Sequence, residues 1–258
     1  MTSPRRALVA SSTPQAQAAA ETLRDRYEWA PLAEAETVVA LGGDGFMLQT
    51  LHAQLDRRAP VAPVFGMNLG TVGFLMNEWR SDGLEARLAA SRPFKVTPLR
   101  MTAITASGET HVIPAINEVS FLRETRQTAK LELTLNERVV MPELACDGIL
   151  VATPAGSTAY NLSAQGPILP LDSAMLAITP ISPFRPRRWR GAIVPDSARV
   201  AIRVLDPGKR PVSVVADQRE VREVSEVRIE IDRARDLTLL FDPEHALDDR
   251  ITMEQFIA

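Results

Sequence analysis

The feature that most constrains the fold is the turn Gly42-Gly43-Asp44-Gly45, which lies between a strand-like apolar run and a helix-like apolar pattern. Glycine has no Cβ, so it fits a tight strand-to-helix turn and lets a ligand approach the backbone. A helix that begins near Gly45 would point free amides and the positive end of its dipole at an anion such as phosphate. Asp44 would repel that anion, so we expect it to hold a metal ion, cap the helix or act on a hydroxyl group. A capped turn without a ligand explains these four residues about equally well.

The first part of the chain alternates between strand-like and helix-like segments. The apolar runs at 6–11, 37–43 and 61–68 read as strands, and the segments at 13–27 and 45–57 read as helices. This order is typical of βαβ units with a parallel sheet. From about Arg92 onward the pattern becomes polar–apolar alternation, which predicts half-buried strands. We therefore expect an α/β domain followed by a β-rich domain.

Composition narrows the class of protein. The chain has 258 residues, 45% of them hydrophobic, and a formal charge of −3, so it lacks the basic excess of a protein that coats nucleic acid. A single cysteine, Cys146, excludes an internal disulfide, and the N-terminal residues lack the apolar core of a signal peptide. The sequence has no apolar run of the roughly 18 residues that cross a bilayer. We expect a cytoplasmic protein that binds small molecules or copies of itself, and neither nucleic acid nor a membrane.

Two polar clusters directly follow or interrupt apolar strands. The glycine-rich segment 65–75 would form a second loop at the carboxyl edge of the parallel sheet, where such folds bind ligands. A bulged turn is the structural alternative. Asn117 and Glu118 are adjacent in an otherwise apolar strand, so one of them faces the core side and needs a partner, which a ligand would supply. A sheet-edge pair that faces water is about as good an explanation.

The densest polar segment spans 146–170, where a carboxylate, an amide and several hydroxyl side chains surround a short apolar strand. Contacts to the edges of a ribose, base or phosphate explain this density better than packing does. A helix capped by Ser157 or Thr158 is the structural alternative.

The segment 180–190 contains four arginines among prolines and reads as an irregular loop. A solvated loop or a subunit contact is the favoured interpretation. Contact with phosphates is the alternative.

Four of these motifs together resemble the NAD kinases, which phosphorylate NAD to NADP. They are GGDG at 42–45, GMNLGTVGFL at 66–75, NE at 117–118 and DGILVATPAGSTAYNLSAQGPI at 147–168. GGDG also occurs in 6-phosphofructokinases and in diacylglycerol and sphingosine kinases, but the third and fourth motifs are specific. The match follows the order and spacing of the family over nearly the whole chain.

The resemblance implies an architecture. It predicts a Rossmann-like α/β nucleotide-binding domain at 1–95, a β-sandwich NAD-binding domain at 96–241, and a terminal segment at 242–258 that docks back onto the first domain. It also implies a cytoplasmic homodimer or homotetramer in which a neighbouring subunit helps complete the NAD site.

The resemblance also assigns site residues. Asp44 would be the general base, Gly45 would help hold the nucleotide and Phe74 would lie close to the adenine. The other residues that would line the NAD site are Asn117, Glu118, Asp147, Ala155, Thr158, Ala159, Tyr160, Asn161, Leu162, Ser163 and, by a looser match, Asp217 and Gln218. The chain departs from the family in having Phe46 rather than a hydroxyl residue after GGDG, Ala155 in place of threonine, and no histidine in the loop 180–195.

These assignments predict transfer of the γ-phosphoryl group of ATP to the 2′-hydroxyl of the adenosine ribose of NAD. A ribose hydroxyl is a poor nucleophile at neutral pH, so a carboxylate such as Asp44 must orient it and take its proton. Amides of the glycine loop and a Mg²⁺ ion on the triphosphate would neutralise the charge of a loose transition state. The three histidines, His52, His111 and His245, show no metal-ligand spacing, so we expect the ion to arrive with ATP.

Three other functions compete with this one. A lipid kinase of the diacylglycerol type shares GGDG and the two-domain plan, but it would need a membrane-facing surface that the sequence does not suggest. A sugar-phosphate kinase of the 6-phosphofructokinase type would need further α/β units in the second half, which reads as β. A nucleotide-binding regulator without activity would have no need to keep Asp44.

Overall fold

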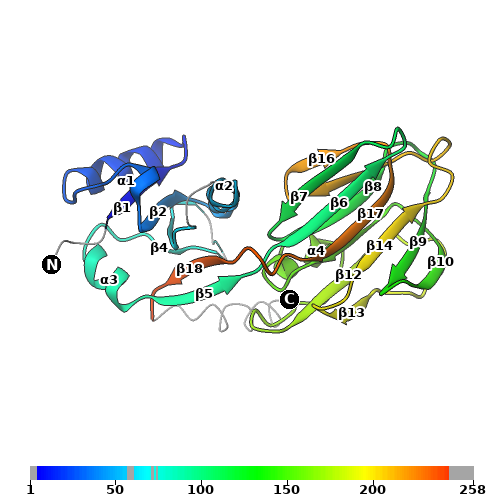
Figure 1. The fold of residues 1–258 in the computed structure, drawn as a ribbon. Helices are drawn as coiled ribbons and strands as arrows, with labels where there is room; N and C mark the ends of the chain where they lie inside the picture. The colour runs from blue at the N-terminus through cyan, green and yellow to red at the C-terminus, as the bar shows by residue number, and fades with distance from the viewer. Residues whose placement is uncertain (1–4, 57–60, 71–72, 74, 244–258) are drawn as a thin grey trace. The chain divides into compact units, whose positions relative to one another are not determined.

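The computed structural model describes residues 5–56, 61–70, 73 and 75–243, and it contains two compact units (Figure 1). Unit 1 comprises residues 1–96 and 235–258, and unit 2 comprises residues 97–234. The stretch 235–241 therefore belongs to unit 1, whereas the sequence placed it in the second domain. The segment predicted to dock back, 242–258, lies outside the described residues except for Asp242 and Pro243.

Unit 1 is built on a six-stranded sheet with the order β1-β2-β3-β18-β5, and β4 pairs with β3 off this path. Only β5 is antiparallel to its neighbour; the other pairings are parallel. The first three strands follow one another along the sheet, so their order differs from the 3-2-1-4 order of a Rossmann sheet. The strands are β1 (Arg6–Ala10), β2 (Thr37–Gly42), β3 (Val64–Asn68), β4 (Asn77–Glu78), β5 (Arg92–Val96) and β18 (Leu237–Phe241).

The helices of unit 1 are α1 (Pro14–Arg24), α2 (Asp44–Leu55), α3 (Leu84–Ala90) and the 3₁₀ helix η1 (Leu32–Glu34). Helix α1 begins as the sequence predicts, because the Thr13 hydroxyl accepts a hydrogen bond from the Ala16 amide and Pro14 needs no partner. No helix among the described residues is long and apolar enough to span a membrane.

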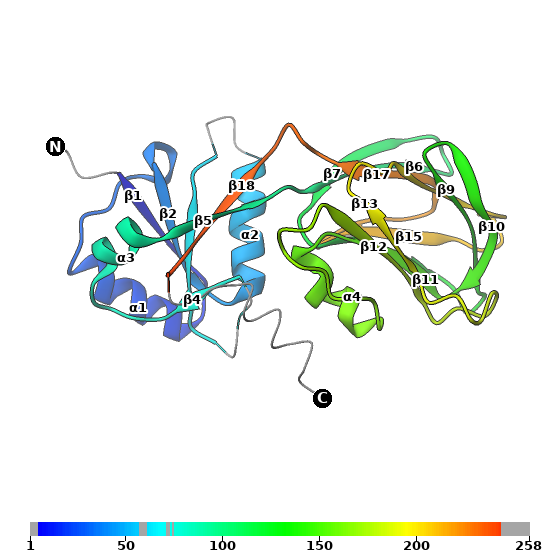
Figure 2. The same cartoon turned by 90° about the horizontal axis from the view of Figure 1, so that it is seen from below.

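Helices cover both faces of the unit 1 sheet (Figure 2). Leu23 of α1 belongs to one buried cluster with Phe65 and Met67 of β3. Gly66, between these two strand residues, faces the other side, and a Cβ there would lie 2.2 Å from Cε of Met47 in α2. The sheet is thus enclosed between α1 and α2, and its strands are accordingly apolar on both faces.

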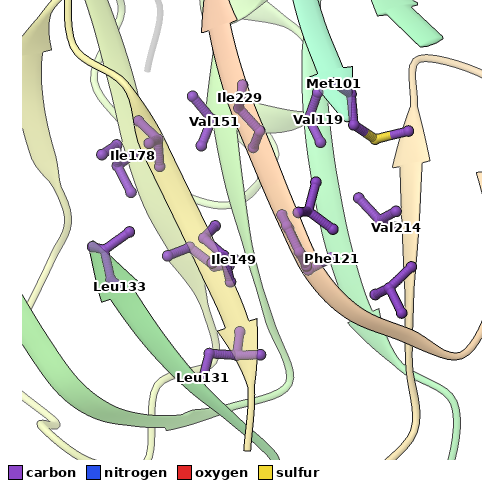
Figure 3. Close-up of a cluster of buried hydrophobic side chains, with 14 of the residues drawn as sticks. Met101, Val119, Phe121, Leu131, Leu133, Ile149, Val151, Ile178, Val214 and Ile229 are labelled. Carbon is purple, nitrogen blue, oxygen red and sulfur yellow. The ribbon is translucent and has the colours of Figure 1, made fainter. Parts of the chain in front are cut away.

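Unit 2 consists of two six-stranded antiparallel sheets, with the orders β10-β9-β14-β17-β6-β7 and β13-β12-β11-β8-β15-β16. Inward-facing side chains of both sheets form one core, to which Phe121, Leu131, Ile149 and Ile229 contribute (Figure 3). The elements are β6 (Leu99–Thr105), β7 (Thr110–Ala115), β8 (Glu118–Arg123), β9 (Ala129–Leu135), β10 (Arg138–Cys146), β11 (Gly148–Ala152), η2 (Ala155–Thr158), α4 (Tyr160–Ser163), β12 (Met175–Ile181), β13 (Ala192–Pro195), β14 (Val200–Val204), β15 (Val212–Ala216), β16 (Arg219–Val221) and β17 (Val224–Ile231).

Two of the short passages from one sheet to the other carry polar residues of the predicted site. Strand β7 ends at Ala115 in the first sheet and β8 begins at Glu118 in the second. Strand β10 likewise ends at Cys146, and β11 begins at Gly148. A Cβ on Gly148 would lie 1.9 Å from the carbonyl oxygen of Phe121, so the second corner requires glycine. The polar residues Asn117 and Asp147 thus lie at sheet-switching corners rather than inside strands.

A buried ion pair ties the returning strand β18 into unit 1. The guanidinium of Arg87 donates to both carboxylate oxygens of Asp242, from Nε at 3.0 Å and from Nη2 at 2.5 Å. Both side chains are about nine-tenths buried, and Arg87 also lies over the ring of Phe65. The Asp242 amide donates to Asn77, whose own amide group donates to the carbonyls of Gly66 and Leu240.

We expect Asp242→Ala to lower the free energy of unfolding by about 3 to 5 kcal/mol, because it leaves the buried Arg87 without its counter-ion. Urea denaturation of the variant and the parent chain measures this difference. Asp82→Ala is the matched control, since it removes the exposed partner of Arg26 and should change stability little. Equal losses in the two variants would mean that the Arg87 pair does not anchor β18.

Candidate functional site

The GGDG motif forms the turn between β2 and α2. Strand β2 ends at Gly42, Gly43 is the N-cap of the helix, and Asp44 is its first residue. A Cβ on Gly42 would lie 2.8 Å from Cβ of Phe46, so the phenylalanine in place of the family's hydroxyl residue fills space that this glycine leaves. Gly45 differs from Gly42: it is exposed, its φ is not left-handed, and no described atom lies within 4 Å of a Cβ built on it. Packing among the described residues therefore does not require glycine at position 45.

The second glycine segment packs on the carboxylate of Asp44. Strands β2 and β3 end side by side, with Gly42 paired to Asn68 and the Leu69 amide donating to the Gly42 carbonyl at 2.8 Å. The Leu75 amide donates to Oδ1 of Asp44 at 3.1 Å. A Cβ on Gly73 would lie only 2.8 Å from the same oxygen. The segment that follows β3 therefore orients the half-buried carboxylate of Asp44. The N-cap position of α2 is occupied by Gly43 and not by Asp44.

A second cluster of polar groups lies at the corner between β7 and β8 in unit 2. Glu118 is 8% exposed, so it does not form the water-facing pair that the sequence left open. Its Oε2 atom and the Oδ1 atom of Asn117 are buried and have no hydrogen-bond partner in the described part of the chain. Such atoms are rare in folded proteins, because each costs about 1 to 3 kcal/mol, and they call for a functional explanation.

Asp217 holds this corner together. It lies in the tight turn between β15 and β16 with a left-handed φ of 54°, a conformation that aspartate tolerates better than most residues. Its carboxylate accepts hydrogen bonds from three consecutive amides, those of Ile116 at 2.6 Å, Asn117 at 2.9 Å and Glu118 at 3.2 Å. Its own amide donates to the Glu118 carbonyl at 3.1 Å. Asp217 thus orients the Asn117–Glu118 pair through the backbone.

The same arrangement sets the protonation of Glu118. Burial, and after it the nearby charge of Asp217, raise the pKa of Glu118 to about 8. Partial burial, and after it the charge of Glu118, raise the pKa of Tyr160. The two side chains belong to one electrostatic cluster, in which Glu118 is mostly protonated at neutral pH and can donate a hydrogen bond.

The residues after β11 fold back onto the same corner. The Thr153 hydroxyl donates to the carbonyl of Ile116 at 2.7 Å and accepts from the Gly156 amide at 3.0 Å. A Cβ on Gly156 would lie 2.1 Å from the Asn117 carbonyl oxygen, so this close approach requires glycine. Ala155, where the family has threonine, is buried in the same turn.

Two polar side chains of this segment bind the loop itself. The Ser157 hydroxyl donates to the Pro154 carbonyl and accepts from the Leu169 amide, so neither it nor Thr158 caps a helix. The fully buried Asn161 donates to the carbonyls of Ser157 and Pro167 and accepts from the Thr179 hydroxyl. Much of the polar density that the sequence attributed to a ligand therefore stabilises the loop.

Asp147 lies at the opposite end of β11 from the Asn117–Glu118 corner of the same chain. It precedes β11, whose far end, Ala152, pairs with Glu118. Five residues of strand separate the two positions by roughly 16 Å. The Asp147 carboxylate accepts from Nε of Arg123 at 2.6 Å.

The remaining predicted residues differ in exposure. Thr158, Ala159 and Leu162 are half-buried, whereas Ser163 and Gln218 are exposed. Phe74 lies outside the described residues. The sequence predicts Thr153 as one of the hydroxyl groups that contact a ligand, whereas in the structure it binds the backbone of the corner. The sequence predicts no individual role for Gly73, although it directly precedes the residue expected near the adenine.

Comparison with known proteins identifies the family. The model of the ATP-NAD kinase C-terminal domain matches residues 116–247. An NAD kinase of Rhizorhabdus wittichii is 68% identical over 256 residues, which cover 99% of each chain. This chain belongs to the NAD kinase family. An NAD kinase of Zymomonas mobilis is 66% identical over 98% of this chain and 97% of its own length, and one of Caulobacter vibrioides is 54% identical over 98% and 96%.

Two solved structures share the fold of this NAD kinase family member. Yeast NADH kinase complexed with NADH superimposes with a TM-score of 0.82 at 19% identity, over 98% of this chain and 87% of that one. An NAD kinase from Archaeoglobus fulgidus in complex with ATP gives a TM-score of 0.75 at 24% identity, over 98% of this chain and all of that one. At such identities the likeness concerns the fold alone. The NAD kinase activity follows from the family match and from the relatives that are more than half identical, and it excludes the lipid and sugar kinases that share GGDG.

We expect the stability of the ligand-free protein to fall as pH rises because of Glu118. The unfolded chain loses this proton near pH 4.5, whereas the folded chain keeps it up to about pH 8. The contribution of Glu118 is therefore fully present below about pH 4.5 and is lost as pH rises towards and through 8. Glu118→Gln stays neutral, so its free energy of unfolding should decline less than that of the parent chain between pH 5 and 8.5.

Denaturation with urea at several pH values checks this. Glu21→Gln, a change on the exposed face of α1, is the matched control and should follow the parent chain. Parallel pH profiles for the parent chain and Glu118→Gln would show that Glu118 is ionised in the folded state.

Proposed function

We propose that Asp44 is the general base of the NAD kinase reaction of this chain, taking the proton of the 2′-hydroxyl of the adenosine ribose while the γ-phosphoryl group of ATP is transferred to that oxygen. The observation that carries the proposal is the fixed position of the Asp44 carboxylate. It stands half-buried in the first turn of α2, is held by the Leu75 amide and is approached closely by Gly73. A base held in place in this way needs little reorganisation before it accepts a proton.

The glycine turn is suited to the phosphates of ATP. The first turn of α2 has amides without intrahelical partners and the positive end of the helix dipole, both of which favour an anion. Gly45, exposed in that turn, lets a phosphate oxygen approach the backbone without meeting a side chain. The oxygen atoms of Asp44 and Asn68 at the ends of neighbouring elements are the kind that Mg²⁺ prefers, so these residues fit an ion carried by the triphosphate. That ion would screen phosphate charge during transfer.

Unit 2 supplies groups suited to NAD. We assign Asn117, Glu118 and Tyr160 to contacts with the ligand, because two of them carry buried oxygen atoms without a described partner and the third is electrostatically coupled to Glu118. Glu118 in its protonated form can donate to a ribose oxygen, whereas an ionised carboxylate can only accept. Asp217 acts on this group through the backbone amides. The rim is formed by the half-buried or exposed residues Thr158, Ala159, Leu162, Ser163 and Gln218.

We further propose a cytoplasmic homodimer or homotetramer in which Asp147 contacts the NAD bound by a neighbouring copy. The strand β11 keeps Asp147 roughly 16 Å from Glu118 in the same chain. Asp147 therefore lies far from the group that we assign to the ligand in its own subunit. A contribution from a second subunit reconciles the family motif with this separation.

We expect Asp44→Asn to lower kcat by about 10² to 10⁴ while leaving the KM for NAD within a few-fold, because the amide keeps the shape of the side chain but cannot take the proton. Steady-state formation of NADP measures both constants. Asp25→Asn at the end of α1 is the control and should behave as the parent chain does. Near-normal turnover in Asp44→Asn would refute the general-base role.

We expect Gly45→Ala to separate stability from activity. Alanine should stabilise the protein by up to about 1 kcal/mol, since it is the better helix former and meets no described atom within 4 Å. It should raise the KM for ATP at least several-fold, because the methyl group lies where the phosphate approaches the backbone. Gly208→Ala, in an exposed turn with equally open surroundings, should leave the KM unchanged. A stabilised Gly45→Ala with an unaltered KM would mean that no phosphate contacts this residue.

A further inference from the structure

Four arginines on the segment between β12 and β13 carry uncompensated charge. Arg185, Arg187, Arg188 and Arg190 are exposed, and none of them forms an ion pair or a side-chain hydrogen bond with another residue in the described part of the chain. Most other exposed arginines of unit 2 pair with a carboxylate, as Arg203 does with Glu132. Four guanidinium groups within six residues thus form a local positive field in a chain whose formal charge is −3.

The backbone that carries these arginines is anchored. The amides of Phe184 and Arg185 donate to the carbonyl of Ala145, whose own amide donates to the Arg185 carbonyl at 2.9 Å. Gly191 has a left-handed φ of 112°, and a Cβ there would lie 2.3 Å from the Ile178 carbonyl oxygen, which fixes the return of the chain to β12. The side chain of Trp189 packs against the core of unit 2. The guanidinium groups are therefore presented from an ordered segment, which lowers the entropic cost of binding an anion.

A polar cavity of about 320 Å³ lies beside this segment, and Arg190 is one of its described lining residues, all of which belong to unit 2. None of its described lining residues is acidic, and those with hydrogen-bonding or stacking groups are Ser163, Gln165, Ser182, Trp189 and Arg190. Hydroxyl, amide and guanidinium donors around a cavity without carboxylates suit an anion that has many acceptor oxygens.

We propose that this segment and its cavity form a second anion site, which binds a linear phosphate chain such as a nucleoside triphosphate or an inorganic polyphosphate. Guanidinium groups bind phosphate oxygens in pairs, and four of them within six residues suit a chain of phosphates better than a single ion. The cavity holds one end of a small ligand, whereas a long nucleic acid would need a basic surface that extends beyond this segment. The site goes beyond the phosphoryl transfer assigned to Asp44 and does not depend on it.

The experiment is calorimetric titration of the full-length protein with inorganic tripolyphosphate, ATP and AMP. The test variant is R187Q/R188Q/R190Q. The matched control is R24Q/R126Q/R138Q, which removes the same charge from three exposed arginines elsewhere that also lack an ion pair in the described part of the chain. We expect the test variant to bind tripolyphosphate at least about tenfold more weakly than the parent chain and the control to bind it as the parent chain does.

The ligands separate the two sources of a phosphate chain. Equal losses of ATP and tripolyphosphate binding in the test variant, each measured against the parent chain, identify an inorganic chain as a sufficient ligand. A larger loss for ATP identifies a nucleotide, and AMP binding should change little in either case. ATP that the test variant still binds occupies the site proposed at the glycine turn. Each of these results supports the site. Because binding is measured without turnover, failure of the Asp44 proposal would leave them unchanged.

Three results would overturn the proposal. The first is tripolyphosphate binding that is the same in the test variant and the control. The second is a changed sedimentation coefficient of the test variant with unaltered tripolyphosphate binding, which would make the segment a subunit contact. The third is a substitution that weakens binding of a single-stranded oligonucleotide but leaves binding of tripolyphosphate, ATP and AMP as it is in the parent chain.

Discussion

The corner between β7 and β8 depends on one interaction, in which the Asp217 carboxylate accepts hydrogen bonds from three consecutive amides. Where the chain leaves one sheet for the other, the amides of residues 116–118 lose their ladder partners, and burying them unpaired would cost about 1 to 3 kcal/mol each. One carboxylate in a left-handed turn satisfies all three. The same contacts place a second carboxyl group, Glu118, beside a negative charge and away from water, which keeps it protonated near neutral pH. Stability of the corner and chemistry of the site therefore share one cause.

The glycines of the motifs fall into two classes with different meanings. Gly148 and Gly156 would each place a Cβ about 2 Å from a backbone oxygen, so the fold itself excludes any other residue. Gly73 likewise leaves space for the carboxylate of Asp44. Gly45 has no such constraint among the described residues, although glycine in the first turn of a helix costs up to about 1 kcal/mol relative to alanine. Because Gly45 weakens the helix and no packing among the described residues requires it, close approach of a ligand is the best explanation for this glycine.

Local patterns predicted the elements well, because periodicity and capping depend on neighbouring residues. Thr13 and Pro14 start α1 as expected, and the strands and helices around GGDG follow the apolar runs. Strand order and domain limits depend on pairing between segments that are distant in the sequence. Strand β18 lies beside β3 in the sheet of unit 1, and no local sequence pattern predicts this pairing. The separation of Asp147 from Glu118 has the same origin. The density of polar side chains at 146–170 is a weaker indicator of a ligand for another reason. Ser157 and Asn161 form hydrogen bonds with neighbouring groups of the protein.

The acidic residues assigned to the site share an electrostatic problem, because NAD and ATP are both anions. Each acid is compensated in a different way. Glu118 is protonated, Asp217 is surrounded by amide donors, and Asp147 pairs with Arg123. Asp44 stands at a helix N-terminus, where a negative charge is stabilised, and accepts from the Leu75 amide. In the proposed reaction only Asp44 acts as a base, and it lies where the helix dipole stabilises a negative charge and where the Leu75 amide orients its carboxylate.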